Sequence, residues 1–239
     1  MDATEIINGA GKAIEEKLVA AYKAELLDDY ADLGELINLK GESTGYTKVW
    51  KGEAGEKISS MSIDIMPDKA RYINIQVIPD PKFRLPHYVY EGLVMGHMSQ
   101  MSVDLYPDTD MVANLDWMLE NYQPAGTVFD ELRKTMELSI SKLTHMRIFS
   151  SPMFAMVKTP ELEKVMEFEG YAARYADCLF DMQAKAELSA ELETHARRER
   201  RKLISDSIIA LDPDRKMVVG VYGEGLTRRI EEATMYSFN

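Results

Sequence analysis

Glu91 is a carboxylate in a stretch that otherwise predicts a buried strand. Residues 84–92 read RLPHYVYEG, and aromatic or β-branched residues between a proline and a glycine are typical of strands. Side chains alternate between the two faces of a strand, so Glu91 shares its face with His87, Val89 and Leu93. A carboxylate that leaves water either finds a partner or holds its proton more tightly. We therefore expect acid–base chemistry at Glu91, or else a solvated strand end or a structural ion pair.

Patterns for other kinds of chemistry are weak. Near Glu91, His87 and His97 lack a third well-spaced ligand, so the sequence predicts no metal site. Cys178 is the one cysteine, which leaves no disulfide, iron–sulfur cluster or multi-cysteine zinc site within the chain. Residues 8–13, NGAGKA, lack the first glycine and the Ser or Thr of a phosphate-binding loop, and no G-x-G-x-x-G pattern follows a strand. We expect no bound metal, nucleotide or flavin.

The chain is acidic, with a formal net charge of −12. This charge argues against broad attraction to nucleic acid or to anionic lipid. The exception is the basic run at residues 195–202, HARRERRK, in which five of the eight residues are Arg or Lys. The run predicts either a solvated helix face or a docking patch for an acidic partner.

The sequence predicts a monomeric protein of the cytoplasm. A single cysteine suits a reducing compartment. Residues 1–17 carry acids near the start and lack the apolar core of a secretory signal. No window approaches about 18 uninterrupted apolar residues, so we expect no segment that crosses a membrane.

The elements that must position Glu91 fall into two blocks. Short turn signals such as PDKA and PDPKFR separate the predicted strands and favour antiparallel pairing, because a parallel crossover needs a longer connection. Strands in one block and helices in the next predict an α+β fold, with helices packed over an antiparallel sheet. No linker is apparent, so we expect one domain over residues 1–239. The predicted strands are 46–51, 58–66, 71–78, 86–95 and 98–106, and the predicted helices are 5–33, 112–121, 127–145, 160–182, 187–211 and 213–236.

A series of short motifs, taken in order, is the strongest signature in the chain. The motifs are Pro79 and Pro81 at a strand end, Leu85-Pro86, Glu91 five positions after that proline, Asp104-Leu105-Tyr106-Pro107, Phe149-Ser150, and Asp212-Pro213-Asp214-Arg215 before Tyr222-Gly223-Glu224. In this order and spacing, the sequence resembles the ferredoxin-dependent bilin reductases over roughly residues 60–239. The N-terminal quarter resembles the family only weakly.

The resemblance implies a fold and a chemistry. The fold is a three-layer α/β/α sandwich with a central antiparallel sheet flanked by helices, which agrees with the order of the predicted blocks. Members of the family reduce open-chain tetrapyrroles in two-electron steps and take the electrons singly from reduced 2Fe-2S ferredoxin. They hold no metal or flavin, so the substrate carries the radical while the protein supplies binding, orientation and protons.

The resemblance also assigns roles to three residues. Glu91 falls at the central catalytic aspartate, which protonates the bilin. Asn74 falls where phycoerythrobilin-forming enzymes carry asparagine and phycocyanobilin-forming enzymes carry histidine. Asp212 matches the late aspartate that serves reduction of the A ring. The three together imply reduction of biliverdin IXα to phycoerythrobilin through 15,16-dihydrobiliverdin.

Glu91 departs from the family pattern, because glutamate is one methylene longer than aspartate and moves the point of proton delivery by about 1 Å. A reductase of red chlorophyll catabolite, which pairs a glutamate with an aspartate, is therefore an alternative. A phycocyanobilin-forming reductase is another. A bilin carrier without catalytic activity is the alternative from a different functional class, although a carrier has no need of buried acids.

Basic and hydroxyl side chains are expected to bind the propionate groups of the substrate, and basic side chains are expected to bind the electron donor. For the propionates we expect Arg215, Lys158 and Ser150, because carboxylates take charge-assisted hydrogen bonds from such groups. Arg215 and Ser150 fall on family motifs, and Lys158 is chosen for its charge. Ferredoxin is acidic, so the basic run is the predicted docking site. The predicted docking residues are Arg197, Arg198, Arg201 and Lys202.

Overall fold

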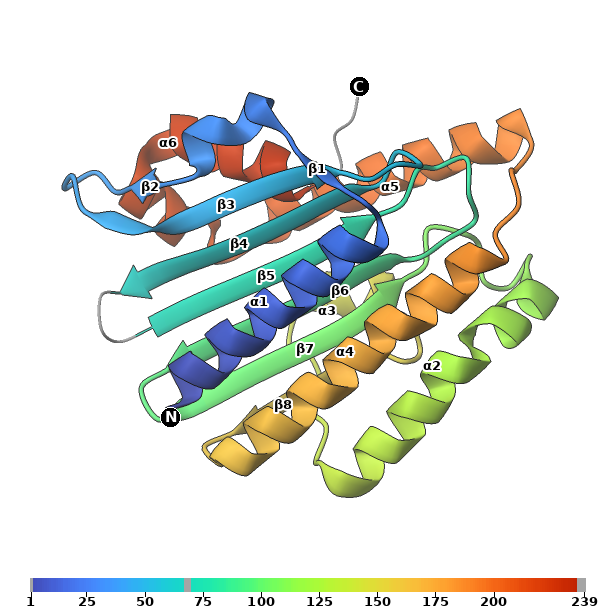
Figure 1. Cartoon of the computed structure of the whole chain (residues 1–239), viewed down its shortest axis with the longest axis horizontal. Helices are drawn as coiled ribbons and strands as arrows, with labels where there is room; N and C mark the ends of the chain where they lie inside the picture. The colour runs from blue at the N-terminus through green and yellow to red at the C-terminus, as the bar shows by residue number, and fades with distance from the viewer. Residues whose placement is uncertain (1, 67–69, 236–239) are drawn as a thin grey trace.

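An antiparallel sheet is the framework that positions the predicted site residues (Figure 1). The computed structural model describes residues 2–66 and 70–235, and within them the sheet has eight strands. Their order is β1-β3-β4-β5-β6-β7-β8, with β2 paired to β3, and every neighbouring pair is antiparallel. The bounds are Glu25–Leu26 (β1), Leu36–Ile37 (β2), Ser43–Lys51 (β3), Lys57–Met66 (β4), Ala70–Ile78 (β5), His87–Met95 (β6), Met98–Tyr106 (β7) and Ala155–Thr159 (β8).

Helices α1 (Ala3–Ala21) and α4 (Leu162–Ala184) cover one face of the sheet, and α2 (Leu115–Thr135) packs against α4 (Figure 1). The first helix begins at a capping box, in which the side chains of Asp2 and Glu5 each accept a hydrogen bond from the other's backbone N–H. Apolar stripes of these helices bury the larger of two hydrophobic cores against the sheet.

Helices α5 (Glu191–Leu211) and α6 (Arg215–Thr234), with the short α3 (Thr144–Phe149), lie on the opposite face of the sheet (Figure 1). A smaller hydrophobic core lies between α6 and strands β3 and β4. Two helical layers around an antiparallel sheet confirm the predicted three-layer α/β/α sandwich.

The predicted helix over residues 5–33 is wrong beyond Ala21. Lys23 has a φ of 44°, a left-handed conformation that α-helices do not contain. The chain turns there, β1 pairs with the end of β3, and a 3-10 helix covers Asp28–Leu33. Pairing with the edge of the sheet therefore overrides the helical spacing of the apolar residues.

The predicted break between helices 112–121 and 127–145 is also wrong. One helix, α2, runs through Pro124, because buried residues on either side of the proline continue a single apolar stripe. It ends at Thr135, and the chain then forms α3 and β8, neither of which the periodicity predicted. The final predicted helix, 213–236, is α6, which bends at Gly223 with a φ of 77°, and residue 236 lies outside the described residues.

None of the helices described within residues 2–66 and 70–235 combines the length and the apolar composition that crossing a membrane requires.

Candidate active site

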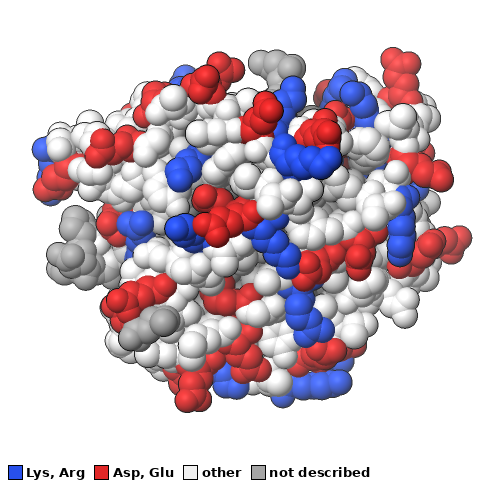
Figure 2. All heavy atoms as spheres, viewed as in Figure 1, with Lys and Arg blue, Asp and Glu red and all other residues white. Residues whose placement is uncertain are grey.

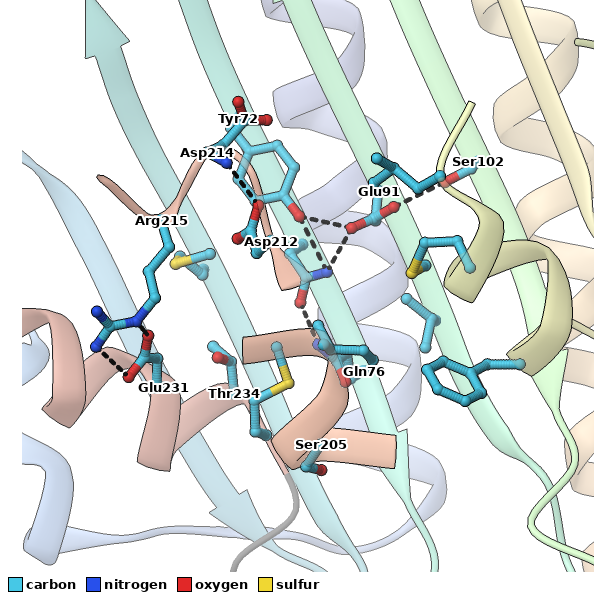
Figure 3. A pocket seen from close by; sticks show the side chains of 18 of the residues that line it. Tyr72, Gln76, Glu91, Ser102, Ser205, Asp212, Asp214, Arg215, Glu231 and Thr234 are labelled. Carbon is cyan, nitrogen blue, oxygen red and sulfur yellow. Dashed lines mark hydrogen bonds and ion pairs between the residues drawn. The ribbon is translucent and has the colours of Figure 1, made fainter. Parts of the chain in front are cut away.

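A cavity of about 420 Å³ lies between the sheet and helices α3, α5 and α6 (Figure 3). This volume falls within the range of pockets that hold small molecules and cofactors. Side chains of β4 to β7 form its floor, and side chains of the three helices form its roof. The lining is largely apolar and rich in methionine, whose unbranched side chain is adaptable; the methionines include Met61, Met146, Met156 and Met217. Such a lining suits a large apolar ligand.

Glu91 lies in the middle of β6 and on the cavity face of the sheet. His87, Val89 and Leu93 line the same cavity, whereas Tyr88 and Tyr90 belong to the hydrophobic core of the opposite face; the predicted alternation is confirmed. Glu91 is therefore not at a solvated strand end.

Three side chains on the neighbouring strands hold the Glu91 carboxylate (Figure 3). Tyr72 donates its hydroxyl hydrogen to Oε1 at 2.7 Å, and Ser102 donates to Oε2 at 3.0 Å. Asn74 Nδ2 lies 3.4 Å from Oε1. Asn74 and Ser102 are the residues directly opposite Glu91 on β5 and β7, so the strand register itself brings them to the carboxylate.

Gln76 fixes the orientation of the Asn74 amide. Its Nε2 donates to Asn74 Oδ1 at 2.7 Å, which turns the amide nitrogen of Asn74 toward Glu91. Tyr72, Asn74 and Gln76 are alternate residues of β5 and so share the cavity face. The result is a continuous polar row across an otherwise apolar floor.

Tyr72 keeps its phenolic proton at neutral pH. Burial raises the pKa of Tyr72 well above its ordinary value, and the negative charge of Glu91 and the hydrogen bond to it raise it further. The negative charge of Asp212 raises the pKa of Tyr72 by a smaller amount.

Asp212 caps the C-terminal end of α5, at the opposite wall of the cavity from the sheet. Its Oδ1 accepts a hydrogen bond from the backbone N–H of Asp214 at 2.8 Å. The pKa of Asp212 is raised, first by burial of the carboxyl group and then by the negative charges of Asp214 and Glu231. Much of the residue is nevertheless exposed, so it lies where the cavity meets solvent. The fold thus brings Asp212 and Glu91, far apart in sequence, to one cavity.

The three predicted propionate-binding residues differ in their access to the cavity. Arg215 lines it and is bound to Glu231 at 2.6 Å and to Glu224 at 2.9 Å. Ser150 is not among the lining residues and donates to the Met146 carbonyl at 2.6 Å. Lys158 is exposed on the edge strand β8, outside the lining, opposite Gln100. Of the three, only Arg215 borders the cavity.

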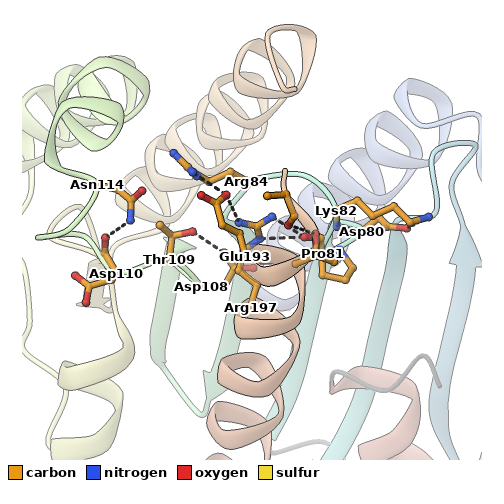
Figure 4. Close-up of polar contacts among 12 residues, drawn as sticks. Asp80, Pro81, Lys82, Arg84, Asp108, Thr109, Asp110, Asn114, Glu193 and Arg197 are labelled. Atoms are coloured by element: carbon orange, nitrogen blue, oxygen red, sulfur yellow. Dashed lines mark hydrogen bonds and ion pairs between the residues drawn. The ribbon is translucent and has the colours of Figure 1, made fainter. Parts of the chain in front are cut away.

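The predicted docking patch requires a correction, because two of its four residues are buried. Arg197 donates from Nε and Nη2 to the Pro81 carbonyl at 3.0 and 2.7 Å (Figure 4). Arg201 has no exposed surface, pairs with the buried Asp108 and donates to the Pro79 carbonyl. Arg198 and Lys202 are exposed. The basic run therefore holds α5 against the sheet with one side and faces solvent with the other.

Several motif residues that carried the resemblance have a structural part in this arrangement. The carbonyls of Pro79 and Pro81 anchor α5, as described above. Asp104 is buried and accepts hydrogen bonds from the hydroxyl and the backbone N–H of Ser151, at 2.5 and 2.9 Å. This contact fastens the segment after α3 to β7 and so fixes one wall of the cavity. Burial raises the pKa of Asp104 to about 7.

The sequence prediction missed Tyr72, Gln76 and Ser102, although signals for each were present. Tyr72 and Gln76 flank Asn74 at the strand period of two. Met95 pairs with Met98 around a two-residue turn, and counting back along that hairpin places Ser102 opposite Glu91.

Comparison with known proteins agrees with the fold and goes no further. No family model matches the sequence, and no curated protein matches it. Among solved structures, the chain is similar to phytochromobilin synthase from tomato in complex with biliverdin, with a TM-score of 0.83 and 13% sequence identity. The match covers 94% of this chain and 80% of the tomato protein. The two proteins therefore share a fold.

Proposed function

We propose that this protein is a ferredoxin-dependent reductase of an open-chain tetrapyrrole. The observation that carries the proposal is the position of Glu91, a hydrogen-bonded carboxylate at the centre of a largely apolar cavity. The shared fold supports it, because the tomato protein is a phytochromobilin synthase whose structure contains biliverdin. The substrate we propose is biliverdin IXα, reduced first to 15,16-dihydrobiliverdin and then to phycoerythrobilin.

In this proposal the protein binds no metal, flavin or nucleotide. Electrons pass one at a time from reduced 2Fe-2S ferredoxin to the bilin, whose conjugated system carries the radical. The protein binds the bilin, orients it and supplies protons. An apolar cavity suits this task, because it excludes water from the reactive intermediate.

Glu91 is the proposed proton donor for the first reduction. Its hydroxyl partners, Tyr72 and Ser102, suit both protonation states, because a hydroxyl donates to a carboxylate and accepts from a carboxylic acid. Asn74 only donates through its amide nitrogen, so it positions Glu91 and the ligand without titrating. Asp212 is the proposed donor for the later reduction of the A ring, and its raised pKa favours the protonated form that a donor needs.

Arg215 is the proposed contact for a bilin propionate at the cavity mouth. Its guanidinium already binds Glu231 and Glu224, so a propionate would share it or displace one of them. Ser150 and Lys158 stay as weaker candidates that need side-chain movement to reach the ligand.

Ferredoxin is the proposed partner of the exposed side of the basic run, where Arg198 and Lys202 remain of the four predicted docking residues. On the molecular face formed by α1, α2 and α4, acidic and basic side chains are interspersed (Figure 2). The cavity and α5 lie on the other side of the sheet. Docking over α5 would bring the donor to the cavity side. We propose that the protein works as a monomer in the cytoplasm.

The test is anaerobic turnover of biliverdin with ferredoxin, its reductase and NADPH. We expect the absorption spectrum to change to that of a more reduced bilin, and to stay unchanged when ferredoxin is omitted. Tight binding of biliverdin without turnover would favour a carrier. Turnover of red chlorophyll catabolite in place of biliverdin would favour the alternative substrate, and phycocyanobilin as main product would contradict the proposed regiochemistry.

A further inference from the structure

We propose that Tyr72 returns protons to Glu91 from Asp212, so that the two acids work in series. This inference rests on the proposed function. Each two-electron reduction of a bilin consumes two protons, whereas one carboxylic acid holds one. Glu91 lies on the sheet at the floor of the cavity and must be protonated again after each transfer. A path from solvent to Glu91 is therefore a requirement of the chemistry.

Tyr72 has the geometry for this path. Its hydroxyl lies 2.7 Å from Glu91 Oε1. Figure 3 shows this hydroxyl between the carboxyl groups of Glu91 and Asp212. Tyr72 and Asp212 both line the same cavity as Glu91.

The other partners of Glu91 are poorly suited to the task. The Asn74 amide does not titrate and lies 3.4 Å from the carboxylate. Ser102 lies on β7, on the side of Glu91 away from Asp212 (Figure 3). Asp212 and Asp214 both line the cavity and are exposed, and of the two it is the Asp212 carboxyl group that lies beside the Tyr72 hydroxyl in Figure 3, so Asp212 can take up protons from solvent and pass them on.

The relay moves protons and no electrons. Glu91 gives its proton to the reduced bilin and becomes a carboxylate. The Tyr72 O–H bond breaks as its proton passes to Glu91, and the tyrosine oxygen takes a proton from a water molecule, which takes one from Asp212. Among residues 2–66 and 70–235, no hydrogen bond joins Tyr72 to Asp212 directly, so a water completes the path. The transfers are concerted, because a free phenolate at Tyr72 is unfavourable.

Tyr72→Phe is the first test, because it removes only the hydroxyl. We expect kcat for biliverdin to fall roughly 10²-fold, with KM changed by less than about threefold, since the ring that packs in the cavity is kept. Tyr72→His should recover part of the lost rate, because an imidazole both accepts and donates a proton. Tyr88→Phe is the matched control: it removes a buried hydroxyl from β6 on the opposite face, where it donates to the Ala172 carbonyl at 3.1 Å. It should keep the parental kcat.

The decisive comparison is the double variant Tyr72→Phe with Asp212→Asn. If the two groups act on one path, the double variant should turn over no more slowly than the slower single variant. If they act independently, the rate losses of the two single variants should multiply. Multiplied effects, or a Tyr72→Phe protein with the parental kcat, would overturn the relay and leave the proposed function intact. A Tyr72→Phe protein that no longer binds biliverdin would make Tyr72 purely structural and would also overturn it. A parent protein that reduces no bilin would overturn both proposals.

Discussion

Two tyrosine–glutamate hydrogen bonds lie on opposite faces of β6. On the cavity face, Tyr72 donates to Glu91 at 2.7 Å; on the face covered by α4, Tyr90 donates to Glu169 at 2.6 Å. Glu91 also accepts from Ser102 and borders the cavity. Within the described residues, the second oxygen of Glu169 is buried without a hydrogen-bond partner, and burial raises the pKa of Glu169 to about 8.

The difference shows what separates the proposed catalytic acid, Glu91, from a structural one. Both carboxyl groups are removed from bulk water, and both receive a tyrosine hydroxyl. Only Glu91 has space for a ligand beside it, several donors that hold its orientation, and a second acid at the same cavity. Glu169 lies between α4 and the sheet, so its raised pKa affects the stability of the fold and not the proposed reaction.

Among variants that test the contrast between Glu91 and Glu169, Glu91→Gln is expected to lose the most activity. Glutamine keeps the shape and the hydrogen bonding but has no proton to transfer, so the first reduction of biliverdin should slow roughly 10²–10⁴-fold. Biliverdin should still bind, as measured by absorbance titration. Glu169→Gln is the control and should reduce biliverdin at the parental rate. Normal turnover by Glu91→Gln would make Glu91 a structural carboxylate.

Asp212→Asn is expected to change the product as well as the rate. Asp212→Asn removes both the proposed A-ring donor and the source of the relay, so the first reduction should slow no more than in Tyr72→Phe, the A-ring step should slow further, and the dihydrobiliverdin intermediate should accumulate. Chromatography of the bilins during turnover measures this. A block at unreduced biliverdin, equal to that of Glu91→Gln, would show that the two acids do not divide the steps in this way.

Glu169 should make the fold less stable as the pH rises. The folded state keeps the Glu169 proton up to about pH 8, whereas the unfolded chain loses it near 4.5. Between these values the unfolded state binds fewer protons, so stability falls by up to about 1.4 kcal/mol per pH unit. In denaturant titrations at about pH 5 and pH 8, Glu169→Gln should lose less stability than the parent over this interval. A residual slope should persist, because Asp104 titrates in the same direction. Equal slopes in variant and parent would refute the assignment.

The smallest effect is expected at the surface of α5. Reversing Arg198 and Lys202 to Glu should slow ferredoxin-dependent turnover severalfold at low ionic strength and leave biliverdin affinity unchanged, since opposite charges steer encounter. Added salt should remove the difference. Arg174→Glu, a reversal at a half-buried position on α4 on the other side of the sheet, is the control. A charge reversal on α5 without effect would exclude this surface from docking.

The sequence predicted the centre of the candidate site well, because strand geometry is local. Side chains alternate along β6, so Glu91 and Tyr90 point to opposite faces of the sheet. This prediction needs no knowledge of the rest of the fold. The same rule applied to β5 would have placed Tyr72 and Gln76 beside Asn74. The central strands were predicted for the same reason, whereas the three-layer order was implied by the resemblance to the bilin reductases.

The remainder depended on tertiary contacts that no local pattern contains. A run of basic residues on a helix is typical of an exposed face, yet Arg197 and Arg201 are buried because the Pro79 and Pro81 carbonyls and Asp108 satisfy them. The end of α1 was missed because the chain leaves the helix to form β1, which pairs with β3. The access of Arg215, Ser150 and Lys158 to the cavity likewise follows from packing and not from spacing.

A crystal structure of the protein with biliverdin bound would test the central claim most directly. We predict that the tetrapyrrole lies on the β4 to β7 floor beneath α3, α5 and α6, with a polar atom within about 3.2 Å of the Glu91 carboxyl group. No bilin should be found near Glu169. A bilin bound outside this cavity, or one within it that does not contact Glu91, would contradict the account.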